Sequence, residues 1–475
     1  MSHRLRNGSS VDELPYFFDN AHAGLADRAR NFAMGQELAE GTHDEDPVSL
    51  AARCRALALA LGREKLLGVC VPAAFGGALM GSRMDAVDVR SVCLLRETLG
   101  WASPLCEFVL AMQGLGSYPI ALGGSDAQRA RLLPAAMSGE QIMAFALTEP
   151  EAGTDAAALQ STAERVPGGY VLQGRKTFIS NAGIADVYVV FVKTEPALGS
   201  RGITAFYVRP TDPGFVFEGA QTLVTDHPVG TLRFDRMPLA ESRRIGAEGE
   251  GLRLAMRTLD TFRTTVGAAA CGMARRALDE SLHRALTRSQ FGKPIGENQI
   301  IQSYLSEMAT ELDAARLLVY RAACAKDRGQ ERPAIDASMA KMFATEAAQR
   351  IVDRAVQIHG GTGVLRGVVV EKLYRDIRAL RIYEGTTEIH LSIIAKVLMA
   401  AERARIEDSM ETRSASRATI PEARRAPDTI ASMAPPSMVT PLQTTAARAS
   451  TASPTVPEMA AQKAKRRAKT DPSKS

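Results

Sequence analysis

The chain has 475 residues, of which 45% are apolar, and carries a formal net charge of +5. Because this length exceeds what one hydrophobic core supports, we expect two or three domains. No stretch of 18 uninterrupted apolar residues occurs, and the first residues lack the apolar run of a signal peptide, so we expect no membrane span and a cytoplasmic protein.

The basic character is concentrated near the end of the chain. Residues 406–475 hold 11 Lys/Arg against 7 Asp/Glu, a net charge of +4, which leaves +1 for the first 405 residues. A nearly neutral core gives no electrostatic argument for nucleic acid. The six cysteines show no Cys-x-x-Cys spacing, and the seven histidines form no His-x-x-x-His pair, so we expect reduced thiols and no disulfide or zinc site.

Residues 10–141 show mostly helical periodicity and predict an N-terminal helical domain. Asp46-Pro47 has the residue types of a helix cap followed by a first helical position. Residues 86–99 predict a second helix, and residues 125–133 a third that ends before Pro134.

A run of short β-prone segments follows and predicts a middle β domain over residues 142–251. Turns rich in Gly, Pro and Asp separate these segments. About seven strands at such spacing are typical of a small β-sandwich or barrel. The segments are residues 142–147, 169–172, 176–180, 187–192, 203–208, 215–217 and 231–234.

Helical periodicity returns over residues 252–405 and predicts a C-terminal four-helix bundle. Its four long helical stretches are residues 252–287, 297–328, 334–358 and 386–404. Residues 406–475 are rich in Ala, Ser, Thr, Pro and Arg, and we expect a disordered basic tail. Its basic cluster at residues 463–469 is either a solvated tail or a weak binding site for an anionic partner.

The stretch Tyr383-Glu384-Gly385-Thr386-Thr387 places a carboxylate at the start of the last long helix. Thr386 or Thr387 can cap that helix, and Gly385 permits a sharp turn. Taken alone, Glu384 is either a solvated residue of an interhelical turn or an acid–base residue presented by rigid helices.

Three other segments have the residue types of a flavin or phosphate site. Residues 146–155 take a strand into a turn of small and hydroxyl residues, which suits a phosphate-bearing ligand or equally an ordinary strand end. Phe178 stands beside hydroxyl residues in 175–183 and could stack on a flat ring or belong to the core. Arg288 in the stretch 288–294 suits a pyrophosphate, or is simply a surface arginine.

Together these segments resemble the acyl-CoA dehydrogenase family over roughly residues 15–400. The matching pieces stand in the family's order: Leu147-Thr148-Glu149-Pro150-x-Ala152-Gly153-Thr154-Asp155, Phe178-Ile179-Ser180, Arg288-x-x-Phe291-Gly292, Gln357-Ile358-x-Gly360-Gly361-x-Gly363 and Tyr383-Glu384-Gly385-Thr386.

The resemblance implies that FAD is held between the β domain and the bundle, in a homotetramer or homodimer. The residues that it assigns to FAD are Phe145, Leu147, Thr148, Gly153, Thr154, Phe178, Ser180, Arg288, Phe291, Gln299, Gln357, Gly360, Gly361, Thr386 and Glu388, with Gln357, Gly360 and Gly361 reaching the FAD of a neighbouring subunit. It assigns Thr154, Asp260, Arg263 and Gly385 to the acyl-CoA substrate.

The resemblance also implies that Glu384 is the catalytic base. In the family this base removes the α-proton of an acyl-CoA while the β-hydrogen leaves as a hydride to FAD. Some subfamilies carry the base just before Arg263, where this chain has Phe262, which cannot accept a proton. The implied reaction is α,β-dehydrogenation in acyl-CoA catabolism, with an electron-transferring flavoprotein as the electron acceptor.

Two alternatives to this function stay open. One is an acyl-CoA oxidase or flavin monooxygenase of the same fold, which would use oxygen directly. The other is a flavin-containing, nucleic-acid-associated protein that uses the basic tail for phosphate contacts. Two departures from the family's pattern, His227 in the stretch 225–230 and His359, reflect either an unusual acyl group or local packing, and we favour packing.

Overall fold

A computed structural model describes residues 10–35, 46–81, 83–330 and 333–418. The chain divides into two units, Met1–Asp408 and Ser409–Ser475. The basic cluster predicted at residues 463–469 lies outside the described residues. The prediction that disorder begins at residue 406 is wrong for residues 406–418, because helix α11 (Thr387–Ala418) continues through them.

The N-terminal region is helical, as predicted. Its helices are α1 (Ser10–Glu13), α2 (Asn20–Met34), α3 (Pro47–Arg63), α4 (Val89–Ala102), α5 (Pro104–Gly123) and α6 (Asp126–Met137). The cap predicted at Asp46 is confirmed, since its carboxylate accepts a hydrogen bond from the Ser49 N–H at 2.9 Å. The end predicted before Pro134 is wrong: α6 includes this proline and stops three residues later.

Helix α5 forms part of the core. Its length and apolar composition would allow it to cross a membrane, but 89% of its apolar window is buried inside the protein. That burial is what the core helix of a globular protein shows. All six cysteines are buried free thiols.

The middle region forms one eight-stranded sheet with the order β6-β7-β3-β2-β4-β5-β8, and β1 pairs with β4 in parallel. The strands are β1 (Met143–Ala146), β2 (Thr162–Val166), β3 (Gly169–Ser180), β4 (Val187–Lys193), β5 (Ile203–Val208), β6 (Phe215–Ala220), β7 (Val229–Ala240) and β8 (Arg244–Ile245). The predicted runs 169–172 and 176–180 are one strand, β3. The predictions missed β2 because its charged Glu164 and Arg165 face solvent and interrupt the apolar pattern.

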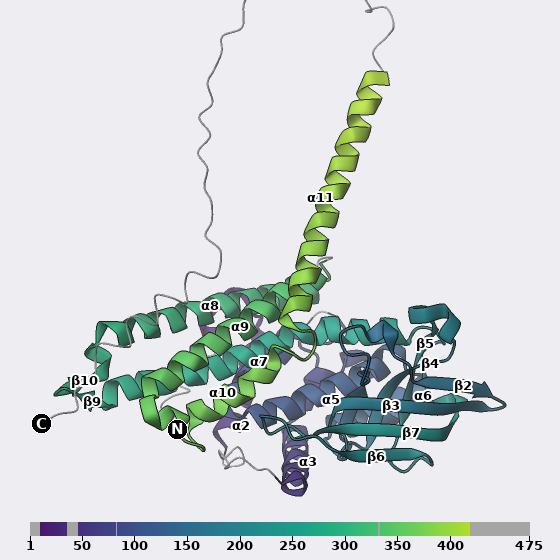
Figure 1. Cartoon of the computed structure of the whole chain (residues 1–475), viewed down its shortest axis with the longest axis horizontal. Helices are drawn as coiled ribbons and strands as arrows, with labels where there is room; N and C mark the ends of the chain where they lie inside the picture. Colours follow the sequence, from purple (N-terminus) through teal and green to yellow (C-terminus); the bar gives the residue numbers. More distant parts are fainter. Residues whose placement is uncertain (1–9, 36–45, 82, 331–332, 419–475) are drawn as a thin grey trace, which may run out of the picture. The chain divides into compact units, whose positions relative to one another are not determined.

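The C-terminal region consists of α7 (Gly251–Thr287), α8 (Gln299–Asp327), α9 (Pro333–His359), α10 (Val369–Leu380) and α11. Four of them match the predicted bundle helices. Helix α10 was missed, although its buried Val370, Leu373, Ile377 and Leu380 have helical spacing, because it is short and lies between two turns. A small hairpin of β9 (Ser289–Gln290) and β10 (Lys293–Pro294) lies at the end of this bundle away from the sheet (Figure 1).

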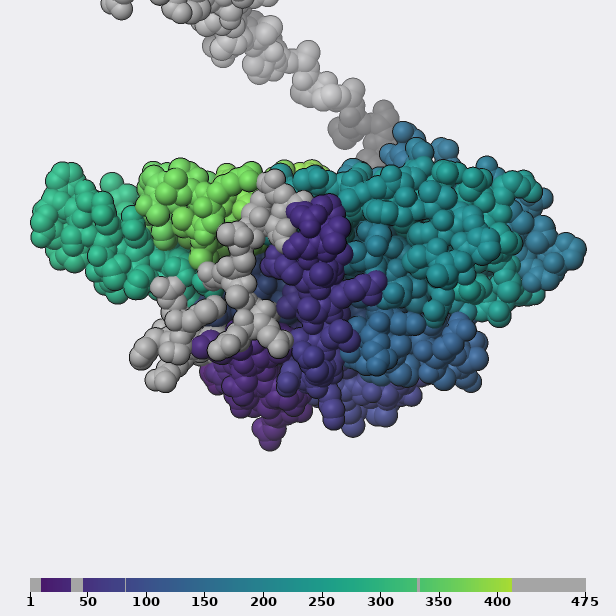
Figure 2. Space-filling view, turned by 90° about the horizontal axis from the view of Figure 1, so that it is seen from below, coloured from purple at the N-terminus to yellow at the C-terminus, as the bar shows by residue number. Residues whose placement is uncertain are grey.

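The three regions pack directly on one another. Figure 2 shows the N-terminal helices, in purple and blue, against both the teal sheet and the green bundle. Helices α4 and α7 approach so closely that a Cβ added at Gly272 would lie 2.0 Å from the Glu97 carbonyl oxygen. Residues of α4 and α5 are thereby brought to the same buried region as α7.

Candidate active site

Glu384 lies in the turn between α10 and α11, with its carboxylate turned into the protein. Both carboxylate oxygens are shielded from solvent and accept no hydrogen bond from the described residues. The backbone at Glu384 is left-handed, with a φ of 54°. A non-glycine residue rarely adopts this conformation, and such strain is concentrated at functional sites. A carboxylate without a partner in such a turn is available to a ligand.

Opposing charges surround this carboxylate. Burial raises the pKa of Glu384, while the cations Arg96, Lys341 and Arg263 lower it and the Glu107 carboxylate raises it again. The net effect is that the pKa of Glu384 is raised above its ordinary value. The three cations keep the ionised form accessible, so the group suits a base that must accept a proton near neutral pH.

Backbone contacts hold the Glu384 turn in place. The Lys341 ammonium donates to the Gly385 carbonyl at 2.7 Å, and Arg263 Nε donates to the Glu384 carbonyl at 3.2 Å. Gly385 has a φ of 101°, and an added Cβ would lie 2.9 Å from His390 Nε2. Thr386 accepts the Ile389 N–H at 3.4 Å, which confirms the predicted cap at the start of α11.

Helix α7 supplies two of the four residues assigned to the substrate, Asp260 and Arg263, from its N-terminal half. Asp260 accepts from Arg263 at 2.6 Å, and this pair joins α7 to the Glu384 turn. Phe262 lies fully buried between α5 and α7, with its ring 5.8 Å from that of Tyr118. The alternative position for a base, just before Arg263, is therefore occupied by an apolar side chain of the core.

A buried ion pair organises the turn after β1. Lys176 is completely buried and donates to Glu149 at 2.7 Å and to the Leu147 and Phe191 carbonyls at 3.1 and 2.6 Å. Desolvation lowers the pKa of Lys176 to about 8, against the opposing effect of Glu149. The backbone that carries Leu147 and Thr148 is therefore fixed by one central cation.

Next to this turn lies an uncovered surface of aromatic, hydroxyl and glycine residues. Phe178 has a φ of 53° and is 62% exposed, although it is a large apolar side chain on a strand. Ser180 is half-buried, Thr154 is exposed, and a Cβ added at Gly153 would meet nothing within 4 Å. An exposed ring beside free hydroxyl donors fits a flat heterocycle with a polar arm.

The other residues assigned to FAD form a second group at the opposite end of the bundle (Figure 1). The end of α7 meets the end of α9 there, since Arg284 donates to the His359 carbonyl at 3.4 Å. The phenyl ring of Phe291 projects fully into solvent. This group comprises Arg288, Phe291, Gln299, Gln357, Gly360 and Gly361, all exposed. In one copy of the chain, the residues assigned to FAD therefore form two separate groups, each a candidate half-site.

Several residues that act on the site were missed from the sequence. Arg96 is fully buried, forms an ion pair with Glu107, and donates to Thr265 Oγ1 at 2.8 Å. Lys341 is buried on α9 among alanines. One signal in the sequence could have found them: each is a charged residue on the apolar face of a predicted helix. Such a residue is almost never buried without a partner, so its presence there indicates a buried polar site.

The two departures from the family's pattern are packed in the interior. His227 is buried and stacks on Phe108 with ring centroids 4.2 Å apart, and burial lowers its pKa to about 4. His359 Nδ1 lies 2.8 Å from the Ala355 carbonyl oxygen. These contacts agree with the packing interpretation.

Three family models match consecutive parts of the chain. They are the N-terminal domain of acyl-CoA dehydrogenase over residues 19–140, the middle domain over residues 144–237 and the C-terminal domain over residues 249–399.

Two characterised relatives align over most of the chain. An acyl-CoA dehydrogenase of Bacillus subtilis is 38% identical over 78% of this chain and 94% of its own length. A 3-(aryl)acrylate reductase of Clostridium sporogenes is 37% identical over 81% of this chain and all of its own length.

Solved structures share the fold. Butyryl-CoA dehydrogenase from Megasphaera elsdenii superimposes with a TM-score of 0.73 and 32% identity, covering 80% of this chain and 99% of that chain. A structure of PigA with FAD and proline gives a TM-score of 0.71 and 28% identity, covering 80% and 98%. From these matches, and from the unpartnered carboxylate in the Tyr383-Glu384-Gly385-Thr386 turn, this chain belongs to the acyl-CoA dehydrogenase family of oxidoreductases.

Proposed function

We propose that the protein removes hydrogen from the α and β carbons of an acyl-CoA thioester, giving the trans-2-enoyl-CoA, with Glu384 as the base. The observation that carries this proposal is the Glu384 carboxylate, shielded from solvent and without a hydrogen-bond partner. An α-proton beside a thioester is too weakly acidic for a solvated carboxylate. Burial raises the pKa of Glu384 and makes its ionised form a stronger base.

The Glu384 turn also offers a donor for the thioester. Lys341 and Arg263 bind the carbonyls of Gly385 and Glu384, and so fix the backbone around the Glu384 N–H. A preorganised N–H aimed at the thioester oxygen would stabilise the negative charge that develops as the α-proton leaves. The same two cations hold the carboxylate within reach of that proton.

FAD is the proposed cofactor, and the uncovered surface around Phe178 fits it. When bound, FAD accepts the β-hydrogen as a hydride. The residues proposed to hold it are Phe145, Leu147, Thr148, Gly153, Thr154, Phe178 and Ser180, completed by Thr386 and Glu388, with the separate group at the end of the bundle serving the adenosine side. Thr154, Asp260, Arg263 and Gly385 are proposed to contact the substrate.

The two half-sites support a homotetramer or homodimer in which neighbouring copies complete each FAD site. We propose an electron-transferring flavoprotein as the acceptor of the electrons, and the cytoplasm as the compartment. The proposed domains are residues 10–141, 142–251 and 252–405. The relative named a 3-(aryl)acrylate reductase favours one alternative, in which the same site adds hydrogen across a carbon–carbon double bond.

The Glu384→Gln variant tests this function. It keeps the size of the side chain but removes the base, so we expect it to retain FAD and to show no flavin bleaching with any acyl-CoA of a panel that bleaches the wild type. Glu402→Gln, a surface change on α11, is the matched control and should bleach normally. Normal reduction of the Glu384→Gln flavin would refute the assignment. Repeating the panel with oxygen present separates a dehydrogenase from an oxidase.

A further inference from the structure

His390 lies in the first turn of α11 and is completely buried. Its ring lies against the turn that carries Glu384, since a Cβ added at Gly385 would be 2.9 Å from His390 Nε2 and 3.1 Å from Cε1. Gly385 also has a φ of 101°, which other residues rarely adopt. The imidazole of His390 therefore occupies the space that a side chain at Gly385 would need.

Helix α9 fixes the orientation of this ring. His390 Nδ1 lies 3.2 Å from Ser338 Oγ, and both side chains are fully buried. Lys341 lies three residues after Ser338, hence on the same face of α9, and donates to the Gly385 carbonyl at 2.7 Å. One face of α9 therefore supports the turn twice, directly through Lys341 and through His390 by way of Ser338.

The ring of His390 is neutral near pH 7, because burial lowers its pKa to about 4. The Gly385 and Glu384 carbonyls act in the opposite direction, as acceptors close to a ring N–H do. A neutral imidazole has one N–H and one acceptor nitrogen. If the Ser338 hydroxyl donates to Nδ1, the N–H is at Nε2, which is the atom that lies against Gly385.

His390 Nε2 is shielded from solvent and has no hydrogen-bond partner among the described residues. A buried polar atom without a partner costs free energy and calls for a reason. The Glu384 and Gly385 carbonyls near it accept from Arg263 at 3.2 Å and from Lys341 at 2.7 Å. Each carbonyl oxygen has two lone pairs, so the Nε2–H can add a third donor to this pair of carbonyls.

Donors on two successive carbonyls fix the peptide planes on both sides of Gly385. Glu384 has a φ of 54°, and such a strained backbone persists only where its surroundings hold it. This φ decides where the Glu384 N–H points. An N–H held toward the place where negative charge develops lowers the barrier, because it need not reorient during the reaction.

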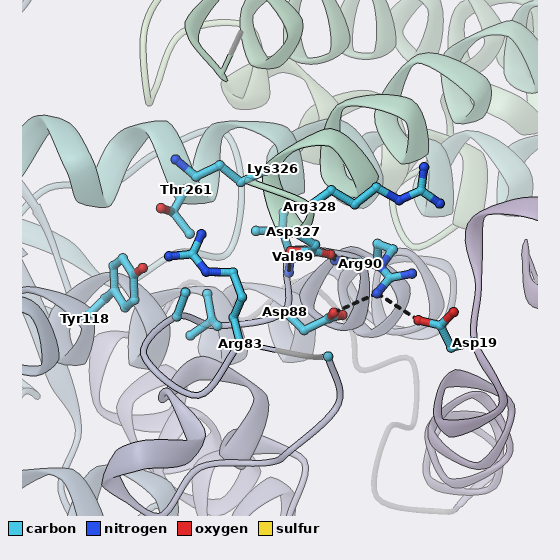
Figure 3. Close-up of a pocket in the computed structure, with 13 residues that line it drawn as sticks. Asp19, Arg83, Asp88, Val89, Arg90, Tyr118, Thr261, Lys326, Asp327 and Arg328 are labelled. Atoms are coloured by element: carbon cyan, nitrogen blue, oxygen red, sulfur yellow. Dashed lines mark hydrogen bonds and ion pairs between the residues drawn. The ribbon is translucent and has the colours of Figure 1, made fainter. Parts of the chain in front are cut away.

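This support of the turn is separate from the cavity that borders α7. The cavity has a volume of about 210 Å³, and Figure 3 shows Thr261 and Lys326 among the residues around it. Thr261 lies two residues before Arg263, but neither His390 nor Ser338 lines the cavity. Substitutions of His390 and Ser338 therefore leave the cavity lining unchanged.

We propose that His390 is a positioning residue for the Glu384 turn. Its Nε2–H tightens onto the Glu384 and Gly385 carbonyls as negative charge develops on the thioester, and so holds the Glu384 N–H toward the thioester oxygen. Hydrogen bonds of an active site commonly tighten in the transition-state complex. This inference rests on the proposed function and adds to it a residue that acts through the turn.

The test uses a 3-thiaacyl-CoA, in which sulfur replaces the β-carbon. This thioester has no β-hydrogen to give as a hydride, but its α-proton can pass to the Glu384 carboxylate. The electron pair of the broken C–H bond then stays on the thioester as an enolate, and nothing is oxidised. An enolate beside oxidised FAD gives a long-wavelength absorbance band, and the pH at which half of the band forms measures how well the site stabilises the charge.

His390→Phe keeps a ring of similar size but removes both nitrogens. We expect the midpoint of the band to rise by about one pH unit, a tenfold loss in the enolate equilibrium. FAD retention and binding of the analogue below the midpoint should stay unchanged. His390→Gln can place an amide donor near the position of Nε2 and should restore most of the loss, whereas the shorter His390→Asn should not.

Ser338→Ala keeps the imidazole but removes the hydroxyl that orients it. It should shift the midpoint in the same direction by a smaller amount, and it tests the proposal if His390→Phe does not fold. Ser281→Ala is the matched control, since this buried serine of α7 donates to the Ala277 carbonyl of its own helix at 2.7 Å. Its midpoint should equal that of the wild type.

An unchanged midpoint in His390→Phe and Ser338→Ala, with only a lower melting temperature, would assign His390 to packing and overturn the proposal. Equal shifts in His390→Gln and His390→Phe would overturn it too, because the donor would then have no effect. A failure of the proposed function looks different. In that case the wild type itself would form no band with the analogue, and no acyl-CoA would bleach its flavin.

Discussion

At the scale of single residues, the environment of Glu384 sets the effect of burial against that of nearby charges. Burial alone would leave it protonated, and three nearby cations alone would make it a weak base. The two effects act in opposite directions here: burial raises the pKa of Glu384, and Arg96, Lys341 and Arg263 limit that rise. The pKa of Glu384 therefore depends on residues of α4, α7 and α9 that are distant from it in sequence.

Replacing Lys341 by Met tests this balance. Lys341 is one of the cations that lower the pKa of Glu384, so its loss should raise that pKa further. The rate of flavin reduction should then need a higher pH to reach half of its maximum, with a larger loss of rate below neutral pH than above it. Stopped-flow measurement of flavin bleaching against pH gives the result.

Lys341→Arg is the control for that experiment, because it keeps the charge and a donor for the Gly385 carbonyl. It should retain a pH profile close to that of the wild type. An unchanged profile in Lys341→Met would show that Lys341 acts only by holding the turn.

The pKa of Glu384 also predicts how stability depends on pH. Its folded pKa is raised, so the group binds its proton more tightly when folded, and the stabilisation is present at low pH and lost as the pH rises through the folded value. Glu384→Gln should therefore raise the melting temperature near pH 8 but not near pH 4, below the ordinary pKa of about 4.3.

Thermal unfolding of both proteins across this pH range measures the difference. Each kcal/mol relieved should appear as only about 1 °C, because the entropy of unfolding is about 2 cal/mol/K per residue and the chain has 475 residues. A gain of the same size at both pH values would mean that the ionised carboxylate is not what destabilises the wild type.

At the scale of elements, the turn between β1 and β2 depends on a single buried lysine. Lys176 of β3 bridges Glu149, the Leu147 carbonyl and the Phe191 carbonyl on β4. The Glu149 carboxylate also accepts a hydrogen bond from the Ser161 N–H at 3.1 Å. The proposed flavin-facing backbone is thus shaped by a polar network below it.

Lys176→Met should lower the free energy of unfolding by about 3–5 kcal/mol, because it leaves the Glu149 carboxylate buried without its partner. Bound FAD should also be lost more readily, since the backbone of Leu147 and Thr148 is no longer fixed. Urea unfolding with absorbance of the bound flavin measures both effects. The double variant Lys176→Met/Glu149→Gln should recover part of the stability, and a double variant as unstable as the single one would contradict this account.

At the scale of the whole molecule, the residues assigned to FAD fall into two groups at opposite ends of the bundle (Figure 1). Phe178 and Phe291, one in each group, are large apolar side chains left in solvent. Both residues also have a left-handed backbone, with φ of 53° and 54°, and such strain is concentrated at functional sites and ligand clamps. A second copy of the chain would bring the two kinds of half-site together.

We therefore expect FAD retention to depend on protein concentration. Dilution through the range in which the oligomer dissociates should release FAD, which the recovery of free-flavin fluorescence reports, while light scattering follows the mass. Phe291→Ala should shift FAD release to higher protein concentration, and Leu286→Ala, an exposed apolar change near the same end, serves as a control. Release of FAD independent of concentration would argue for a site complete within one copy.

The sequence by itself determined the order of helical, β and helical regions, the cap at Asp46, and the turn that carries Glu384. These features depend on local periodicity and on residue types at turns, which act over a few neighbours. Its resemblance to a family pattern also supplied the site residues that we propose. It did not yield the short helix α10 or the charged strand β2, where the local pattern is weak.

Only the tertiary structure decided what surrounds Glu384. Arg96, Arg263 and Lys341 come from three different helices, and their effect on the carboxylate depends on distance and burial, which no local pattern contains. The same holds for the cavity that Arg83 and Lys326 both line, although more than 200 residues of chain separate them. Electrostatic energies follow separation in space rather than in sequence, so the turn that carries Glu384 was visible in the sequence but its electrostatic environment was set by the fold.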